Sequence, residues 1–166
     1  MGLSPRTLGL LIAAVTLAVD QGHKIWMLDV FDITARQPVA LTPFLELVMA
    51  WNPGISYSLL SAETPEGRYA LLALSLVATA LLGLWLWRAP ARLTTVGLGL
   101  IVGGALGNAY DRFAYGAVAD FFHFHVGSFH WYIFNLADVA IVAGVGLLLY
   151  ESFFVAGKKN EIAQGG

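Results

Sequence analysis

Residues 69–87 read YALLALSLVATALLGLWLW, a run with no charged side chain and no proline. A helix needs about 20 predominantly apolar residues to cross the hydrocarbon core of a bilayer. In the whole chain of 166 residues, 58% of the side chains are hydrophobic and 12% are charged, about half the charged fraction of ordinary soluble domains. The run therefore predicts a transmembrane helix, and the composition excludes a water-soluble enzyme.

Three further apolar runs are long enough to cross a bilayer, so that four spans are expected at about residues 7–27, 69–87, 93–112 and 133–155. Five of the nine basic side chains flank one set of span ends, and an excess of Lys and Arg marks the cytoplasmic side of a membrane protein. These residues are Arg6, Arg88, Arg92, Lys158 and Lys159. Both termini are therefore expected in the cytoplasm, with residues 28–68 and 113–132 on the outer face.

The first outer segment contains Pro38, Pro43, Pro53 and Gly54 among short apolar stretches such as residues 39–49, a pattern typical of strands and turns. A helix is expected in this segment only at about residues 56–62, lying along the membrane surface. The predicted fold class is an all-α integral membrane protein. It has four transmembrane helices and a small extracytoplasmic β-rich cradle between spans one and two, in a single membrane domain over residues 1–166.

Several classes of function lack the residues that they require. The chain has no cysteine, which excludes disulfides, iron–sulfur clusters and zinc–thiolate sites. Its net charge of −2 gives no basic patch, so no nucleic-acid partner is expected. The Gly-x-Ser-x-Gly, His-Glu-x-x-His and P-loop motifs are all missing from the sequence, which argues against a serine hydrolase, a zincin and a nucleotide-driven protein.

Polar side chains within the spans gather at one depth, close to the outer ends. A charged group at the bilayer centre costs about 2.5–3.5 kcal/mol, so each one requires a structural or chemical reason. Asp20 and Lys24 stand four residues apart and can pair on one helix face. The other members are Asn108, Asp111 and Arg112 on the third span and Asn135 and Asp138 on the fourth. We expect each helix to turn this polar stripe inward.

The third span also carries Gly99, Gly103 and Gly107 at intervals of four residues. Such a stripe of small residues lets another helix approach closely. Because the fourth span is also rich in Ala and Gly, it is the expected neighbour.

Two carboxylates are the strongest candidates for chemistry. Asp120 lies among apolar residues in the second outer segment, and Asp138 has no basic residue after it until Lys158. If the intervening segment folds back as a loop, the two carboxyl groups meet and share a proton, because two adjacent carboxylates do not both ionise cheaply. One member then activates a water while the other polarises a carbonyl, which is peptide hydrolysis without a covalent intermediate.

Three alternatives compete with this interpretation. A metal could bind Asp120, His123 and His125, with His130 as a fourth ligand, although an aromatic belt at the membrane interface explains the same segment. A small proton-coupled membrane carrier also uses intramembrane carboxylates, but it would need them along a path to both faces. The third alternative is a structural helper subunit whose polar clusters only fix packing. The preferred interpretation requires no metal and no cofactor.

Five sequence motifs occur in an order that resembles the bacterial lipoprotein signal peptidases (signal peptidase II). They are residues 20–24 (DQGHK), 52–54 (NPG), 103–112 (GGALGNAYDR), 118–121 (VADF) and 134–138 (FNLAD). The resemblance implies an aspartic peptidase of the bacterial inner membrane. Such an enzyme removes the signal peptide from prolipoproteins, cutting before a cysteine that carries a diacylglyceryl group.

The resemblance also implies roles for individual residues. Asp120 and Asp138 correspond to the catalytic pair, and the residues that hold substrate and order this pair correspond to Asn108, Arg112 and Asn135. Supporting positions correspond to Asp20, Lys24, Asn52, Gly54 and Asp111. Arg112 is expected to pair with Asp111 or to face lipid phosphate and substrate carbonyls. The implied partners are lipid-modified prolipoproteins, membrane lipids and cyclic peptide inhibitors of the globomycin type.

Overall fold

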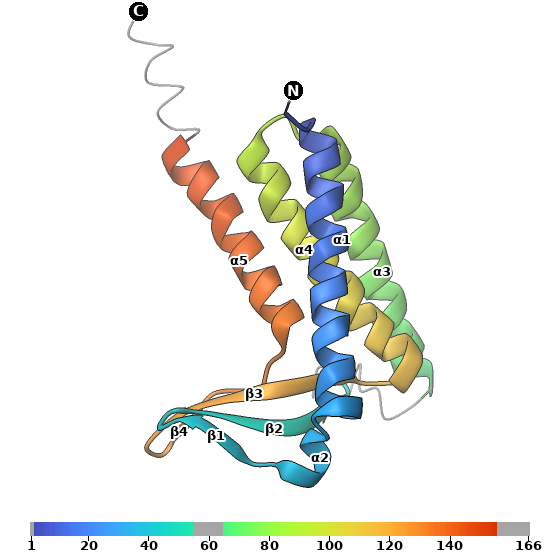
Figure 1. The fold of residues 1–166 in the computed structure, drawn as a ribbon. Helices are drawn as coiled ribbons and strands as arrows, with labels where there is room; N and C mark the ends of the chain where they lie inside the picture. Colours follow the sequence, from blue (N-terminus) through green and yellow to red (C-terminus); the bar gives the residue numbers. More distant parts are fainter. Residues whose placement is uncertain (1, 55–64, 156–166) are drawn as a thin grey trace, which may run out of the picture.

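The computed structural model describes residues 2–54 and 65–155, and four long helices dominate it (Figure 1). These are α1 (Pro5–Ile25), α3 (Pro65–Arg88), α4 (Arg92–Tyr115) and α5 (Leu136–Tyr150). π-helical turns extend two of them, η1 (Trp26–Val30) after α1 and η2 (Glu151–Val155) after α5. All four are long and apolar enough to cross a membrane, which confirms the predicted fold class of four transmembrane helices. Helix α4 ends at Tyr115, three residues beyond the expected end at 112. Helix α5 begins at Leu136, three residues after the expected start at 133.

Helix α4 is the centre of the bundle, buried over most of its apolar length, whereas the other three helices turn most of their residues outward. Glycines let its neighbours approach. A Cβ added at Gly103 would lie 2.5 Å from the backbone oxygen of Ala13 in α1, and one at Gly104 would lie 2.6 Å from that of Ala137 in α5. The stripe that includes Gly99 and Gly103 therefore faces α1. The expectation that it faces the fourth span is wrong, because α5 packs on another line of small residues.

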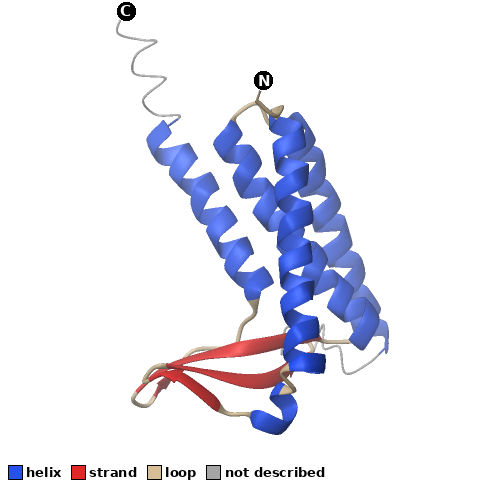
Figure 2. Cartoon of the chain, viewed as in Figure 1, coloured by secondary structure: helices blue, strands red, loops and turns tan. Residues whose placement is uncertain are grey.

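A four-stranded antiparallel sheet lies at the end of the bundle opposite the N-terminus, here called the sheet end (Figure 2). Its strands are β1 (Val39–Thr42), β2 (Leu45–Asn52), β3 (Val118–Val126) and β4 (Phe129–His130), in that spatial order. The small β-rich element is therefore confirmed, but half of its strands come from the second outer segment. Asp120 lies on β3, which satisfies its backbone hydrogen bonds along β2, and the segment between Asp120 and Asp138 folds back through the β3–β4 hairpin.

A short helix that the sequence analysis did not predict, α2 (Ile33–Arg36), precedes the sheet. It forms where Ile33 is fully buried in a small core with Met27, Leu47 and Phe121. This core joins the end of α1 to the inner face of the sheet. The surface helix expected at residues 56–62 lies outside the described residues, as do Lys158 and Lys159.

Candidate active site

Three charged side chains form a buried cluster at the sheet end of the bundle. The Nζ of Lys24 lies 2.8 Å from Asp20 Oδ2 and 2.7 Å from Asp111 Oδ2, and none of the three side chains is more than 3% exposed. We call these residues the Lys24 cluster. The predicted Asp20–Lys24 pair is confirmed. Of the two expectations for Arg112, the pair with Asp111 is wrong, since the Asp111 carboxylate binds Lys24. The reason is geometric, because consecutive residues on a helix do not face each other.

The two carboxylates of the Lys24 cluster also bind backbone. Asp20 Oδ1 accepts a hydrogen bond of 3.0 Å from the N–H of Ala137, and Asp111 Oδ2 accepts one of 3.2 Å from the N–H of Ala119. Ala137 and Ala119 immediately precede Asp138 and Asp120. One buried ionic cluster therefore fixes the backbone beside both candidate carboxyl groups.

Asp120 is almost fully buried and accepts a hydrogen bond at each carboxyl oxygen. Asn135 Nδ2 donates to Oδ1 at 2.6 Å, and Asn52 Nδ2 donates to Oδ2 at 3.0 Å. Burial raises the pKa of Asp120 to about 6, with the charge of Asp138 adding to the rise and the two amide hydrogen bonds opposing it. A carboxyl group with this pKa exchanges its proton near neutral pH.

Asp138 lies in the first turn of α5, where it forms a capping box with Asn135. The N–H of Asn135 donates to Asp138 Oδ2 at 3.1 Å, and the N–H of Asp138 donates to Asn135 Oδ1 at 3.0 Å. The other carboxyl oxygen, Oδ1, accepts from Asn108 Nδ2 at 2.9 Å. Asn135 therefore contacts both carboxyl groups, Asp120 through its side chain and Asp138 through its backbone.

Asn108 joins this carboxyl pair to the Lys24 cluster. Its Oδ1 accepts from Asn135 Nδ2 at 3.1 Å and from Lys24 Nζ at 3.3 Å, while its Nδ2 donates to Asp138. Both the oxygen and the nitrogen of the Asn108 side-chain amide are therefore bound. The Lys24 ammonium only donates hydrogen bonds, so the amide oxygen must face it, and this fixes the orientation of the amide.

Arg112 borders a cavity of about 290 Å³ between α3, α4 and α5, which is also lined by Asn108 and Ile141. Its Nη1 donates to the backbone oxygen of Asn108 at 3.3 Å. Its buried Nε has no hydrogen-bond partner within the described part of the chain. Asp138 lines a second cavity of about 330 Å³, together with aromatic side chains that include Trp131 and Phe134. Polar groups of the site thus border two hollows large enough for parts of a ligand.

Gly54 supports the site through Asn52. The N–H of Gly54 donates to Asn52 Oδ1 at 3.0 Å, which turns the amide nitrogen of Asn52 toward Asp120. Gly54 has a φ of 112°, a backbone conformation that favours glycine, and a Cβ added there would lie 2.5 Å from Leu71. The glycine of the Asn-Pro-Gly motif is therefore required both by its φ and by close packing.

Sequence reasoning missed Gln21, which binds both acidic members of the Lys24 cluster. Its Nε2 lies 2.9 Å from Asp111 Oδ1, 3.1 Å from Asp20 Oδ2 and 3.2 Å from the backbone oxygen of Gly107. One lysine does not neutralise two carboxylates, so the Gln21 amide donates further hydrogen bonds to both of them. Its position directly after Asp20 was the available signal.

The histidines of β3 belong to a different surface. His123 Nδ1 lies 2.9 Å from Glu46 Oε1, and the rings of His125 and His130 lie within 5.5 Å of the His123 ring centre. Successive strand residues point to opposite faces, so Asp120 is directed away from His123 and His125. The described residues contain no group of three or more His, Asp or Glu side chains placed to hold a metal. The metal interpretation therefore has no geometric support.

Comparison with known proteins agrees with this geometry. A family model described as Signal peptidase (SPase) II matches residues 12–154. A lipoprotein signal peptidase from Methylocella silvestris is 66% identical over 154 residues, which cover 93% of this chain and 90% of the relative. Another from Beijerinckia indica subsp. indica is 58% identical and covers 91% of this chain and 90% of the relative.

Solved structures give the same fold. A bacterial membrane enzyme determined by the in meso method at 2.3 Å resolution has a TM-score of 0.67 at 26% identity, covering 87% of this chain and 89% of that one. A second, determined at 1.9 Å, has a TM-score of 0.75 at 24% identity, with 88% and 92% covered, and shows the fold alone. These findings do not support the carrier interpretation. The chain belongs to the signal peptidase II family of membrane aspartic peptidases.

Proposed function

We propose that this chain removes the signal peptide from prolipoproteins in the bacterial inner membrane, with Asp120 and Asp138 as the catalytic pair. The cut falls before a cysteine that carries a diacylglyceryl group. The observation that carries the proposal is the position of Asn135, which donates to a carboxyl oxygen of each aspartate, at 2.6 Å and 3.1 Å. Since one residue donates to both carboxyl groups, the two lie close to each other, which supports their assignment as the pair of an aspartic peptidase.

The pair hydrolyses a peptide bond when it holds one proton. The ionised carboxyl group takes a proton from a water molecule, and the resulting hydroxide adds to the scissile carbonyl carbon while the protonated group donates to the carbonyl oxygen. As the tetrahedral intermediate collapses, the group that took the water proton gives it to the leaving amine, and the other carboxylate takes back a proton from a hydroxyl of the intermediate. The pair therefore ends with the one proton with which it began. The pKa of Asp120, raised to about 6, increases the protonated fraction of this carboxyl group near neutral pH compared with an ordinary aspartate.

Asn108 and Arg112 are placed to hold the substrate. Both border the cavity between α3, α4 and α5, and the buried Nε of Arg112 is a donor that a substrate carbonyl can use. A diacylglyceryl group keeps the substrate in the bilayer and presents the scissile bond at this depth. Cyclic peptides of the globomycin type inhibit by occupying the same site.

The proposed orientation rests on the distribution of basic residues. Arg6 lies at the start of α1, and Arg88 and Arg92 flank the α3–α4 connection, at the end of the bundle opposite the sheet (Figure 1). Because Lys and Arg concentrate on the cytoplasmic side, both termini face the cytoplasm and the active site lies near the outer surface.

The test is cleavage of a diacylglyceryl-modified precursor by Asp120→Asn and Asp138→Asn variants reconstituted in membranes. Loss of either proton-transfer group lowers the cleavage rate by about 10²–10⁴-fold. Asp29→Asn, at an exposed carboxylate on η1, is the matched control and retains wild-type activity. Near-normal cleavage by either variant rejects the catalytic pair. Equal cleavage of an unmodified precursor rejects the lipid-modified substrate.

A further inference from the structure

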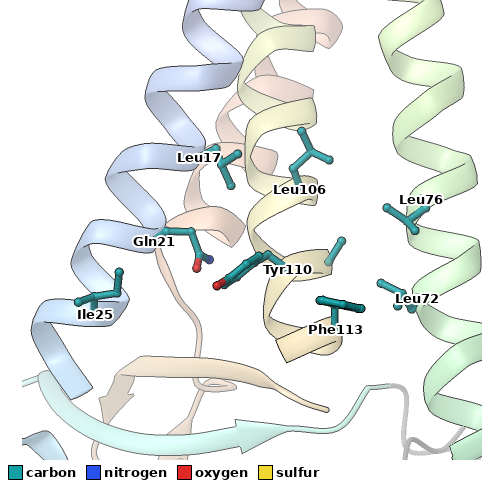
Figure 3. A pocket seen from close by; sticks show the side chains of 9 residues that line it. Leu17, Gln21, Ile25, Leu72, Leu76, Leu106, Tyr110 and Phe113 are labelled. Carbon is teal, nitrogen blue, oxygen red and sulfur yellow. The ribbon is translucent and has the colours of Figure 1, made fainter. Parts of the chain in front are cut away.

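Arg68, in the first turn of α3, binds the end of α4. Its Nε donates to the backbone oxygen of Arg112 at 3.0 Å, and its Nη2 donates to that of Phe113 at 2.6 Å. Phe113 and Leu72, one turn further along α3, line the same hollow between α1, α3 and α4 (Figure 3). Arg68 therefore joins two helices at the sheet end of the bundle, close to the candidate active site.

The two carbonyl groups that Arg68 binds belong to the last turn of α4. The last four carbonyl groups of an α-helix have no partner within the helix, and they carry the negative end of its dipole. The N–H of Gly116 donates to the backbone oxygen of Arg112 at 3.1 Å. Arg68 brings a second donor to this oxygen, a donor to the oxygen of Phe113, and the positive charge that this helix end favours. The two donors sit on one rigid fork, which a lysine does not have.

Gly116 leaves room for the guanidinium of Arg68. It has a φ of 84°, and a Cβ added there would lie 3.0 Å from Nη1 and 3.2 Å from Cζ of Arg68. The guanidinium therefore lies against the turn that leads from α4 to Val118, where β3 begins. Arg68 thus holds the last turn of α4 from outside the helix.

The side chain of Arg112 depends on this turn for its position. Its Nη1 donates to the backbone oxygen of Asn108 at a long 3.3 Å, and its buried Nε has no partner among the described residues. A cation in the last turn of a helix is attracted to free carbonyl groups at the helix end. Because Arg68 occupies two of these groups, the Arg112 guanidinium stays at the cavity between α3, α4 and α5, which Asn108 also lines.

We propose that Arg68 is a positioning residue for substrate binding, which acts by keeping the Arg112 guanidinium at this cavity. The inference rests on the proposed function and on the role of Arg112 in holding substrate. Arg68 does not act on the carboxyl pair. The side chains that donate to Asp120 and Asp138 are those of Asn52, Asn108 and Asn135. Loss of the Arg68 guanidinium therefore weakens substrate binding and leaves the chemical step in place.

The first test is the kinetics of Arg68→Gln with the diacylglyceryl-modified precursor. We expect KM to rise about tenfold, the lower value for loss of one hydrogen bond from a charged donor. We expect kcat to stay within about twofold of wild type, because this pattern marks loss of binding and not of catalysis. Arg68→Lys keeps the charge but not the fork, so its KM lies between the two. Arg36→Gln is the matched control, because it removes an exposed guanidinium that contacts the ring of Phe31, and its KM equals that of wild type.

A double-mutant cycle separates a positioning role from a general structural one. The cycle combines Arg68→Gln with Arg112→Gln, and it measures the Kd of the modified precursor in Asp120→Asn proteins, so that no variant needs to be active. If Arg68 acts through Arg112, its loss changes Kd by less than about twofold once Arg112 is gone. The same tenfold effect in both backgrounds would show that Arg68 supports binding without Arg112, and it overturns the proposal.

Hydrogen exchange tests the contact itself without substrate. The amide groups of residues 113–116 are expected to exchange about tenfold faster in Arg68→Gln than in wild type, because the helix end loses a charged donor. Unchanged exchange would show that Arg68 does not hold this turn, and the proposal fails. A fall in kcat with KM unchanged would assign Arg68 to the frame of the carboxyl pair and also rejects it. If wild type itself does not cleave the precursor, the proposed function fails, and this outcome is distinct because wild type cleaves in all the others.

Discussion

Removal of the Asn52 amide is predicted to shift the pH dependence of cleavage toward higher pH. Asn52 Nδ2 donates to Asp120 Oδ2 at 3.0 Å and thereby stabilises the ionised carboxylate. Loss of this donor in Asn52→Ala raises the pKa of Asp120 further above its ordinary value, because only the charged form loses a hydrogen bond. Asp120 sets one limb of the pH–rate profile, as base or as acid. In either case that limb moves to higher pH.

The size of the shift follows from the exposure of Asn52. A hydrogen bond to a charged group contributes about 1.5–3 kcal/mol, and 1.36 kcal/mol corresponds to one pH unit. Asn52 is exposed, so water replaces part of the lost bond and the lower figure applies. We therefore expect a displacement of about one pH unit, with Asn135 still bound to the other carboxyl oxygen.

The measurement is kcat/KM for the modified precursor between pH 4 and pH 9, in wild type and Asn52→Ala. Glu46→Gln is the matched control, because Glu46 lies on the same strand but contacts His123. Its profile is expected to coincide with wild type. If the Asn52→Ala enzyme is active and its pH profile of kcat/KM stays in place or moves to lower pH, the link between this amide and the protonation of Asp120 is refuted.

Three further predictions concern the frame of the site. Lys24→Met leaves two buried carboxylates without their cation and lowers stability by about 3–5 kcal/mol, measured by thermal unfolding in detergent. Adding Asp111→Asn recovers part of the loss, and purely additive losses would contradict the ion pair. Gly103→Ala costs about 1–3 kcal/mol in the same assay because its Cβ meets α1, whereas Gly83→Ala, with open space around it, costs nothing; equal melting temperatures would argue against tight α1–α4 packing. EDTA leaves cleavage unchanged, and a loss of activity that zinc restores would revive the histidine–metal interpretation.

The parts of the fold that follow from local sequence were predictable. A chargeless run such as residues 69–87 has few alternatives to a membrane helix, and the motifs around Asp120 and Asp138 predicted these two residues as the candidate pair. Strand β3 was not predicted, because Phe121 and Phe122 are both apolar and hide its alternation, and because its partner β2 lies about 70 residues earlier in the chain.

Contacts between helices were harder to predict than the helices themselves. The spacing of Gly99 and Gly103 shows that some helix approaches closely, but it carries no information on which one. A pair with the sequence neighbour Arg112 was one of the expectations for Asp111, whereas the folded bundle supplies Lys24 from another helix. Gln21 was passed over because its amide is uncharged, and its position directly after Asp20 gains meaning only when both carboxylates that it binds are seen together.

Asp20 binds the backbone N–H of Ala137, and Asp111 binds that of Ala119. Because of these two hydrogen bonds, the active site is complete only when the bundle and sheet have assembled. Four separate pieces of chain, from α1, α4, β3 and α5, must come together before either aspartate has its neighbours in place. A newly inserted chain with one helix still undocked has the acidic residues but no means of aligning them. Peptidase activity therefore requires that the last of these pieces has docked, and a partly assembled chain in the membrane is inactive.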